Sequence, residues 1–452
     1  MSGLLRLLLI CGAGLISLPA LATTDTHKAL LARGQYLSQA ADCAACHRGP
    51  TSGTSDYQGG LAIETPLGTV IGTNITPSKR HGIGGYSEEQ FRRALTEGIR
   101  ADGSHLYPVM PYQAYRGMND EDIHALYTWL REGVAPVDQP PPETHLPFPF
   151  SIRSLMKVWN TLHAGPPEPV AALDTPELRR GYYLVEVLGH CSACHSPRTL
   201  TLGEDNQRRF SGAHQEGWLA PNITADRKSG IGSWSDSEII SYLRDGHASG
   251  KGVAAGGMAE AVEYSLRHLS AADLQAITAY LRKIPAVATT GQSPSTHQPA
   301  GDTLADNPEA HRLYQSACAA CHRESGAGAY NDTFPSLTHS ATTASVDPSN
   351  LVMVILDGVH RQGNIGRAEM PGFRDVLDDS QVALLAGYVA QKFGNSQITV
   401  DESFVASARQ GGARPWWLTA LPWLCAGLLI VLIIVLVVIL RRRRTTARSH
   451  SL

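Results

Sequence analysis

The sequence predicts an all-α protein made of three tandem domains and one C-terminal membrane helix. A Cys-x-x-Cys-His motif occurs three times at wide intervals in the 452-residue chain. Segments with helical apolar spacing flank each copy, which is typical of a repeated helical domain. An uncharged apolar run near the C-terminus is long enough to cross a bilayer. A chain of this length exceeds what one compact core normally accommodates, which agrees with several domains.

The composition is that of a globular protein with an acidic body. Apolar residues make up 43% and charged residues 17% of the chain, which excludes a disordered protein. All 41 acidic residues lie between positions 23 and 440, but only 32 of the 38 Lys and Arg do so. A nucleic-acid partner is not expected, because phosphate binding needs a basic face.

The N-terminus has the pattern of a secretory signal peptide over residues 1–22. Arg6 is followed by a short apolar run and then by Pro19-Ala-Leu-Ala22, and these are the three parts of such a signal. The alternative is a retained membrane anchor, although the run is short for a bilayer span. Cys11 lies inside this segment and leaves the mature chain if the signal is cleaved.

Residues 416–440 are predicted to form a transmembrane helix. The stretch 418–440 has 23 residues without a charge, and tryptophans lie at its N-terminal side, where aromatic rings favour the membrane interface. Arg441 to Arg444 follow directly. The positive-inside rule places residues 441–452 in the cytoplasm and everything before the helix on the outside.

The three motifs predict covalent attachment of haem. In each motif the two cysteines stand three positions apart, so that they can reach the two vinyl groups of one haem, and the next residue can bind the iron as proximal ligand. Disulfides do not require an adjacent histidine, and three copies in one exported chain argue against a zinc or redox site. The sequence therefore predicts three haem c groups, attached at Cys43, Cys46 and His47, at Cys191, Cys194 and His195, and at Cys318, Cys321 and His322.

A methionine recurs in all three repeats at one fixed distance from a glycine that ends an apolar helical segment. The three pairs, each 12 positions apart, are Gly98 and Met110, Gly246 and Met258, and Gly358 and Met370. Methionine sulfur opposite a histidine gives a six-coordinate electron-transfer haem with a raised potential. Met110, Met258 and Met370 are therefore the predicted distal ligands, whereas Met118 and Met353 break the count and are predicted to be packing residues. Histidine is the rival distal ligand, and the available ones are His81, His105, His247, His339 and His360.

A second recurring element lies 27 residues after the motif histidine in the first two repeats. It is Asn74-Ile-Thr76 in one and Asn222-Ile-Thr224 in the other. Recurrence at one offset favours a structural turn near the haem edge over a glycosylation site. Helices are expected on both sides of each haem, at 30–40, 120–131, 177–188, 271–283, 308–317 and 379–393.

Linker composition sets the predicted boundaries. Proline-rich and polar segments divide the chain into a first cytochrome domain, a Pro-rich linker, a second domain, a second linker, a third domain and a membrane tether; the corresponding ranges are 28–136, 137–172, 173–287, 288–306, 307–395 and 396–415. We call the three domains the first, second and third repeat. Within the Pro-rich linker, residues 151–163 are more apolar and are expected to pack against either a neighbouring domain or a partner subunit.

These motifs and their flanks resemble those of a known family. The carriers are Cys43-Ala-Ala-Cys-His47, Asn74-Ile-Thr-Pro77, Leu106-Tyr-Pro-Val-Met-Pro-Tyr112, Cys191-Ser-Ala-Cys-His195, Asn222-Ile-Thr224, Gly257-Met-Ala-Glu260, Cys318-Ala-Ala-Cys-His322 and Met370-Pro-Gly-Phe373. Over about residues 28–395 the chain resembles the triheme cytochrome c subunit of membrane-bound periplasmic dehydrogenases of proteobacteria, such as quinone-type alcohol dehydrogenase and flavin-dependent gluconate or sorbitol dehydrogenase. Several members of that family attach to the membrane without so clear a C-terminal span.

The resemblance implies three class I c-type cytochrome domains in the periplasm, held by one span in the bacterial inner membrane. It also implies a catalytic partner of flavin, PQQ or molybdenum type, a possible small third subunit, and ubiquinone or a terminal oxidase as electron acceptor. The chain is then an electron-transfer subunit without catalytic residues of its own. The alternatives are the cytochrome subunit of a molybdenum hydroxylase or aldehyde dehydrogenase, and a multihaem peroxidase, which needs an open distal site that regular methionines disfavour.

Overall fold

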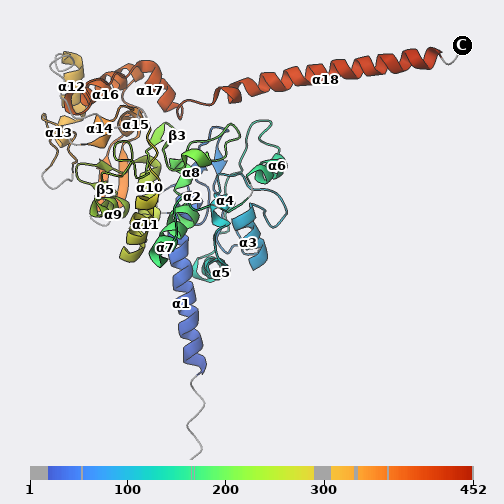
Figure 1. Ribbon diagram of the computed structural model, residues 1–452, viewed down its shortest axis with the longest axis horizontal. Coiled ribbons are helices and arrows are strands. Elements are labelled where there is room, and N and C mark those ends of the chain that lie inside the picture. The colour runs from blue at the N-terminus through green and yellow to red at the C-terminus, as the bar shows by residue number, and fades with distance from the viewer. Residues whose placement is uncertain are drawn as a thin grey trace, which may run out of the picture.

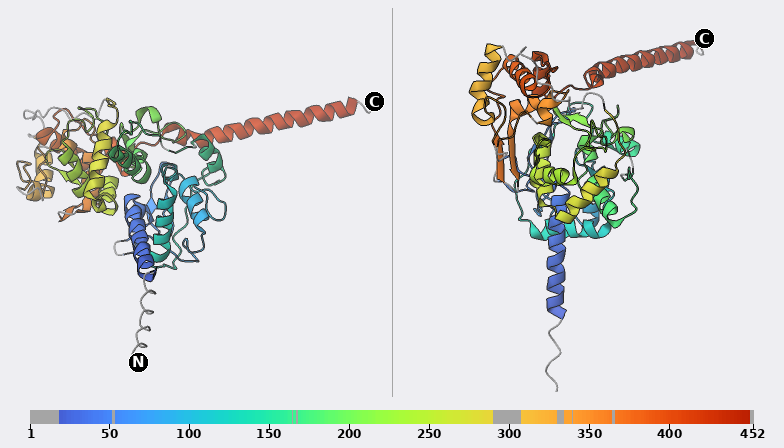
Figure 2. Two further views of the ribbon diagram at one scale, coloured as in Figure 1. Left: turned by 60° about the horizontal axis from the view of Figure 1, so that its bottom comes forward. Right: turned by 60° about the vertical axis from the view of Figure 1, so that its left-hand side comes forward.

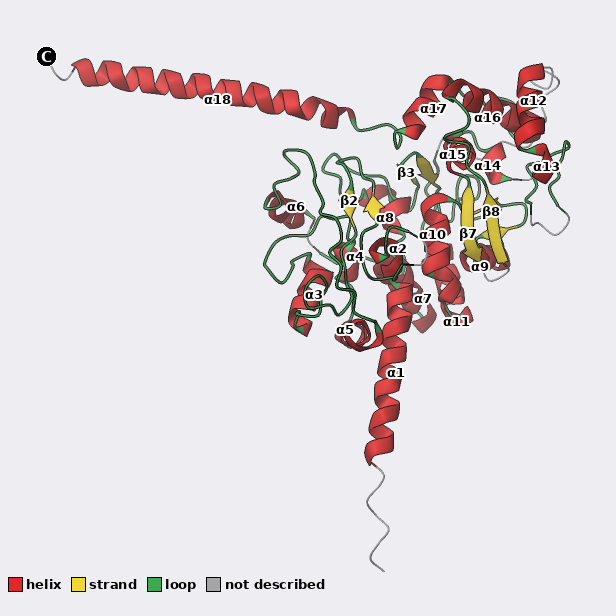
Figure 3. Ribbon diagram, turned by 180° about the vertical axis from the view of Figure 1, so that it is seen from behind, coloured by secondary structure: helices red, strands yellow, loops and turns green. Residues whose placement is uncertain are grey.

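The computed structural model describes residues 19–51, 54–163, 165–166, 168–289, 307–329, 334–338, 340–363 and 366–449. These residues are mostly helical, and their strands form four two-stranded antiparallel hairpins. Figure 1 shows a body from which the N-terminal helix and the long C-terminal helix project in different directions, and Figure 3 shows the same arrangement from behind.

The first repeat places the expected helices on either side of its motif. Ser87 begins one helix with a reciprocal capping box to Gln90, and Gly98 ends it in the left-handed conformation at φ 67°, which glycine adopts without strain. The elements are α1 (Pro19–Ala40), α2 (Cys43–His47), β1 (Ala62–Ile63), β2 (Val70–Ile71), α3 (Glu88–Glu97), α4 (Tyr112–Tyr115), α5 (Asp120–Thr128) and the π-helical turn η1 (Trp129–Gly133).

The second repeat follows a similar order with four more short elements. Ser235 caps a helix that ends at Gly246, again in the left-handed conformation. The elements are α7 (Pro176–Tyr182), the π-helical η2 (Tyr183–Leu188), α8 (Ser192–His195), η3 (Asn206–Arg208), β3 (Ala213–Gln215), β4 (Trp218–Ala220), α9 (Asp236–Asp245), β5 (His247–Ala248), β6 (Gly252–Val253), α10 (Gly256–Tyr264), η4 (Leu266–His268) and α11 (Ala271–Lys283).

The third repeat departs most from the pattern, because a longer hairpin replaces part of the loop before its methionine. Its elements are α12 (Pro308–Ala317), α13 (Ala319–His322), α14 (Ala341–Ala344), α15 (Ser349–Asp357), β7 (Val359–Gly363), β8 (Gly366–Met370) and α16 (Asp379–Phe393). The remaining helices of the chain are α6 (Leu155–Leu162), α17 (Glu402–Arg409) and α18 (Trp416–Ser449).

Glycines let the two main helices of the first and second repeats touch backbone to backbone. A Cβ added at Gly34 in α1 would lie 2.1 Å from the carbonyl oxygen of Ala125 in α5. A Cβ added at Gly181 in α7 would lie 2.1 Å from the carbonyl oxygen of Ala276 in α11. The two helices expected in each of these repeats are therefore present, with the same close crossing in both.

The two Asn-Ile-Thr segments form equivalent buried turns. Thr76 Oγ1 donates to Asn74 Oδ1 at 2.7 Å, and Thr224 Oγ1 donates to Asn222 Oδ1 at the same distance. Each asparagine amide also donates to the backbone carbonyl of a residue that follows the last helix of its repeat, Val137 in one and Val287 in the other. Both asparagines are buried, so the predicted structural turn is confirmed and these amides are closed to glycosylation.

The first and second repeats share one hydrophobic core, whereas the third repeat has its own. Tyr36 of the first repeat donates to Asp273 of the second at 2.5 Å, and Tyr183 of the second donates to Asp122 of the first at 2.7 Å. Each aspartate also pairs with an arginine of its own repeat. This reciprocal exchange links the two repeats as a pseudo-symmetric pair.

The structure changes the expected connection between the third repeat and the C-terminal helix. The membrane tether at 396–415 contains α17, and its Val405 and Ala408 are buried in the core of the third repeat, so this segment is not a free linker. The Pro-rich linker contains α6. The second linker at 288–306 lies outside the described residues apart from its first two positions, as do residues 1–18 of the predicted signal peptide.

The long C-terminal helix has the properties expected of a membrane span. In the described chain, the one helix that is long and apolar enough to cross a membrane is formed by Trp416–Ile439, with a mean hydropathy of 3.1 and none of it buried. Helix α18 continues through the four arginines to Ser449, so the predicted cytoplasmic tail is largely helical. Figure 2 shows this helix extending away from the body in two further views.

Candidate functional site

The three motif histidines make the same hydrogen bond. His47 Nδ1 lies 2.6 Å from the carbonyl oxygen of Thr73, and His195 Nδ1 lies 2.6 Å from that of Pro221. His322 Nδ1 lies 3.0 Å from the carbonyl oxygen of Pro335. A carbonyl only accepts, so each Nδ1 carries the proton, and each Nε2 keeps a lone pair that can bind a metal.

Burial keeps these histidines in the form that binds iron. The pKa of His47 and of His195 lies below its usual value because burial disfavours the charged ring, and the pKa of His322 is lowered for the same reason. A neutral imidazole with a fixed tautomer is what a metal ligand requires.

A large cavity joins the predicted ligands of the first repeat. Cys43, Cys46, His47 and Met110 all line it, and its volume is about 1640 Å³. Cavities that hold small molecules usually measure roughly 300–1,000 Å³, so this one has room for a ligand of macrocycle size. Cys194 of the second motif lies in the same cavity, so the first and second motifs face a common space.

The cysteines have the state that haem attachment needs. All six motif cysteines are unpaired, so the disulfide alternative is not realised. Burial raises the pKa of Cys43, Cys46 and Cys191 to about 12. Neutral thiols buried beside a cavity are compatible with thioether formation.

Two further residues of the cavity, which the motif pattern does not include, directly precede the first cysteine of a motif. Asp42 and His190 both have a positive φ, at 53° and 37°, and both line the large cavity. Burial raises the pKa of Asp42 and lowers that of His190 to about 4. Among the described residues, Asp42 Oδ1 is one of the few buried side-chain oxygens or nitrogens without a hydrogen-bond partner. Their common position immediately before the first cysteine of a motif is the sequence feature that could have indicated them.

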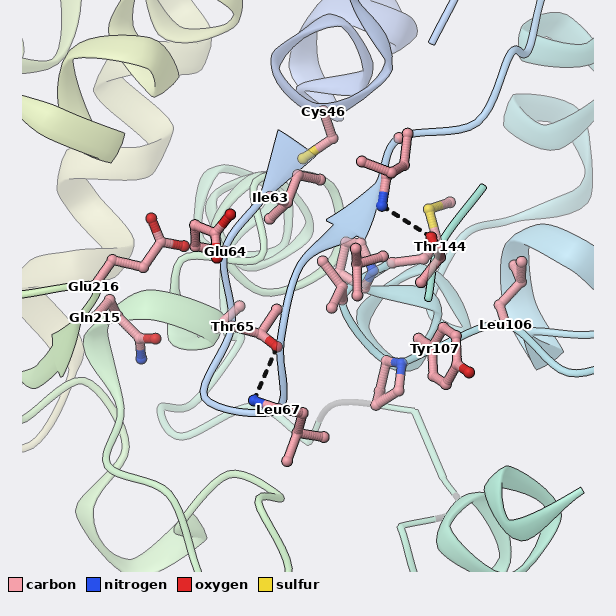
Figure 4. Close-up of a pocket in the computed structure, with 18 of the residues that line it drawn as sticks. Cys46, Ile63, Glu64, Thr65, Leu67, Leu106, Tyr107, Thr144, Gln215 and Glu216 are labelled. Carbon is pink, nitrogen blue, oxygen red and sulfur yellow. Dashed lines mark hydrogen bonds between the residues drawn. The ribbon is translucent and has the colours of Figure 1, made fainter. Parts of the chain in front are cut away.

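Acidic side chains gather where the first two repeats meet. Figure 4 shows Glu64 and Glu216 side by side at the wall of the cavity that Cys46 also lines. Burial, together with the negative charges of Glu260 and Glu64, raises the pKa of Glu216 to about 7. A carboxyl group that titrates near neutral pH therefore lines the cavity shared by the first and second motifs, and sequence spacing alone gave no sign of it.

The structure places the three predicted distal methionines differently. Met110 shares the cavity with His47. Met258 is the third residue of α10, and Met370 is the last residue of β8, where it pairs with Val359. Both are half-buried, but the large cavity does not include them. The glycines that precede all three methionines do end helices, as the spacing predicted.

These residues fit a covalently bound haem. At the cavity, the buried thiols of Cys43 and Cys46 would attach such a group, and the Nε2 lone pair of His47 would bind its iron. Within the described part of the chain, no cluster of three or more His, Cys, Asp or Glu could hold a separate metal ion.

Family models match both ends of the haem-binding region. The model "Cytochrome c" matches residues 31–133, which contain the first motif. The model "Cytochrome C oxidase, cbb3-type, subunit III" matches residues 305–389, which contain the third. Both descriptions are of haem c proteins, and they agree with the helices and buried cysteines described above.

Relatives match almost the whole chain. The fructose dehydrogenase cytochrome subunit of Gluconobacter japonicus is 42% identical over 90% of this chain and 88% of its own. The gluconate 2-dehydrogenase cytochrome c subunit of Pantoea cypripedii is 36% identical, covering 88% and 93%. The cytochrome c subunit of the quinone alcohol dehydrogenase of Gluconobacter oxydans is 34% identical, covering 88% and 86%. With this identity over most of both chains, the protein belongs to the family of cytochrome c subunits of membrane-bound dehydrogenases.

Proposed function

We propose that this chain is a triheme electron-transfer subunit that accepts electrons from a catalytic dehydrogenase subunit in the periplasm and passes them towards ubiquinone or a terminal oxidase. The observation that carries the proposal is the threefold recurrence of a Cys-x-x-Cys-His motif whose histidine donates Nδ1–H to a backbone carbonyl. The relatives are cytochrome subunits of dehydrogenases, which supports the same role.

Haem c, when bound, supplies reversible one-electron chemistry. The cysteines of each motif would attach it, and the histidine would bind its iron through Nε2. Met110, Met258 and Met370 are proposed as the opposite ligands. The carbonyls of Thr73, Pro221 and Pro335 would hold the imidazole planes in place, because each accepts the proton of a ligand ring.

The proposed location follows from α18. Its apolar part would cross the inner membrane with the four arginines on the cytoplasmic side, so that the three repeats lie in the periplasm. The donor would oxidise an alcohol, a sugar or a sugar acid, since the relatives serve fructose, gluconate and alcohol dehydrogenases.

The test is to purify the full chain from membranes of its own host with a C-terminal tag and to identify the subunits that remain bound. Adding fructose, gluconate or ethanol to that complex should reduce the haems, as followed by the α-band in the visible spectrum. Haem content measured against protein should give three per chain. A complex without a dehydrogenase subunit, or haems that react with peroxide at rest, would contradict the proposal.

A further inference from the structure

Exposed apolar side chains are concentrated in one place on the body. Eight large apolar residues before Trp416 are exposed in the described chain, and two of them, Phe334 and Val376, belong to the third repeat. The other six lie in or beside the α6 segment and are 40–76% exposed: Phe148, Ile152, Leu155, Val158, Leu162 and Leu200. We call these six residues the apolar patch. Such a concentration marks an interaction surface, whereas single exposed apolar residues are ordinary.

Helix α6 is fixed to the body by its other side. Met156 and Asn160 are buried, and Asn160 Oδ1 accepts a hydrogen bond from Tyr112 at 2.6 Å. Trp159 Nε1 donates to the carbonyl oxygen of Thr201 at 2.7 Å, next to Leu200. The polar side chains on the inward side of α6 therefore have hydrogen-bond partners in the body. The apolar residues of the helix that remain follow an i, i+3, i+7 spacing, which places Leu155, Val158 and Leu162 on one outward face.

The charge around the patch differs from that of the rest of the body. Residues 144–167 contain no Asp or Glu, although the exported region as a whole is acidic. The charged residues of this stretch are Arg153 and Lys157, and Lys157 is exposed. An apolar face with aromatic and basic neighbours is the composition of a helix that lies in the surface of an anionic membrane.

The apolar patch lies on the side of the body from which α18 extends. Figures 1 and 3 both show α6 on the side of the body towards which α18 extends. Arg153 and Trp159 line the same cavity as residues 410–414, which lead into α18. A bilayer that contains α18 would therefore pass close to α6.

We propose that the apolar patch docks on the outer leaflet of the membrane, with Leu155, Val158 and Leu162 inserted at the level of the headgroups. The contact gives the body a second attachment besides α18 and orients the first repeat towards the lipid. Neither the number of haems nor the identity of the dehydrogenase enters this inference, which goes beyond the proposed electron-transfer role.

The test uses the full chain with its copurified subunits, reconstituted into vesicles of phosphatidylcholine and phosphatidylglycerol. A diazirine-bearing amino acid replaces Val158 in one variant and Val376 in the matched control, which is also an exposed valine. After illumination, mass spectrometry identifies what each position has captured. Phospholipid adducts at 158, and few or none at 376, are expected.

Two other captures would overturn the proposal. Adducts at 158 to a dehydrogenase subunit or to a second copy of this chain would mean that a protein covers the patch. Equal lipid yields at 158 and 376 would mean that the capture is unspecific. Unchanged haem spectra in both variants would show that the body is intact.

Charge reversal gives a second readout. Lys157→Glu should lower the lipid capture at 158 by more than about fivefold in anionic vesicles, because the loss of one basic residue near such a surface accounts for about that factor and the new carboxylate is also repelled. The same substitution should have little effect in phosphatidylcholine alone. Lys28→Glu, an exposed lysine of α1, is the control and should change neither yield. Loss of capture that is the same in both kinds of vesicle would exclude the anionic headgroup as the partner.

Discussion

Two methionines of the first repeat have different surroundings. Met110 lines the cavity that also holds His47, whereas Met118 is 7% exposed and packs in the shared core. Met110 also packs at the edge of the same core, and its proposed role as a ligand depends on its spacing from Gly98 and on its place in the cavity.

Replacing Met110 by alanine should leave the haem attached and open its iron to carbon monoxide, because the thioether proposed to close the sixth position is gone. The measurement is the visible spectrum of the reduced protein before and after addition of carbon monoxide. Met118→Ala should instead lower the free energy of unfolding by about 2–5 kcal/mol, as for other buried methionines, without carbon monoxide binding. Identical carbon monoxide spectra for the two variants would refute the assignment of Met110.

Glu216 is expected to make a haem potential depend on pH. Its pKa is raised to about 7, first by burial and then by the charges of Glu260 and Glu64. Above that pH the carboxylate is negative and favours the oxidised haem, so the midpoint potential should fall as the pH rises through about 7, by at most about 59 mV per unit.

The measurement is a spectroelectrochemical titration of the wild-type protein and two variants between pH 5 and 9. Glu216→Gln should flatten this part of the profile, whereas Glu309→Gln, an exposed carboxyl of the third repeat, should leave it unchanged. A persisting slope in Glu216→Gln would assign the proton to another group.

At the scale of elements, the helix crossings decide how the first and second repeats close. Gly34 and Gly181 allow carbonyl groups of the facing helix to approach within the space that a Cβ would fill. The helices themselves could be predicted from apolar periodicity, since α11, α12 and α16 begin and end at the predicted residues. Their crossing points could not, because one glycine in a helix does not say which neighbour it meets.

Gly34→Ala and Gly181→Ala should each lower the free energy of unfolding by about 1–3 kcal/mol, because the added methyl group overlaps a carbonyl of the facing helix. Chemical denaturation followed by circular dichroism would measure the change. Gly85→Ala is the control, since nothing lies within 4 Å of an added Cβ there and its φ is not positive. An equal loss in all three variants would show that the crossings are not tight.

The whole molecule combines a paired unit, a third unit and an anchor. The first two repeats share a core and exchange hydrogen bonds through Tyr36 and Tyr183. The third repeat packs against the second by other contacts, such as the ion pair of His214 with Asp347.

Deletion from Trp416 onwards should release a red protein into the periplasm, because α18 supplies most of the apolar surface for insertion. Fractionation of cells with a salt wash measures the outcome, since contact through the apolar patch alone would be reversible. Deletion of residues 441–452 alone is the control and should leave the protein in the membrane fraction. A truncated protein that resists the salt wash would place the anchor elsewhere.

Local pattern was sufficient to identify the motifs, the methionine spacing, the Asn-Ile-Thr turns, most helices and the apolar C-terminal run, because each depends on residues close together in the chain. Tertiary structure alone decided that the first and second repeats share one core and that α17 packs against the third repeat. It also decided that Asp42, His190 and Glu216 line one cavity, and that α6 lies on the side of the body towards which α18 extends. These features depend on contacts between residues up to 237 positions apart, as between Tyr36 and Asp273. Periodicity and spacing say which face of a helix is buried, but the partner of that face is chosen by the packing of the whole chain.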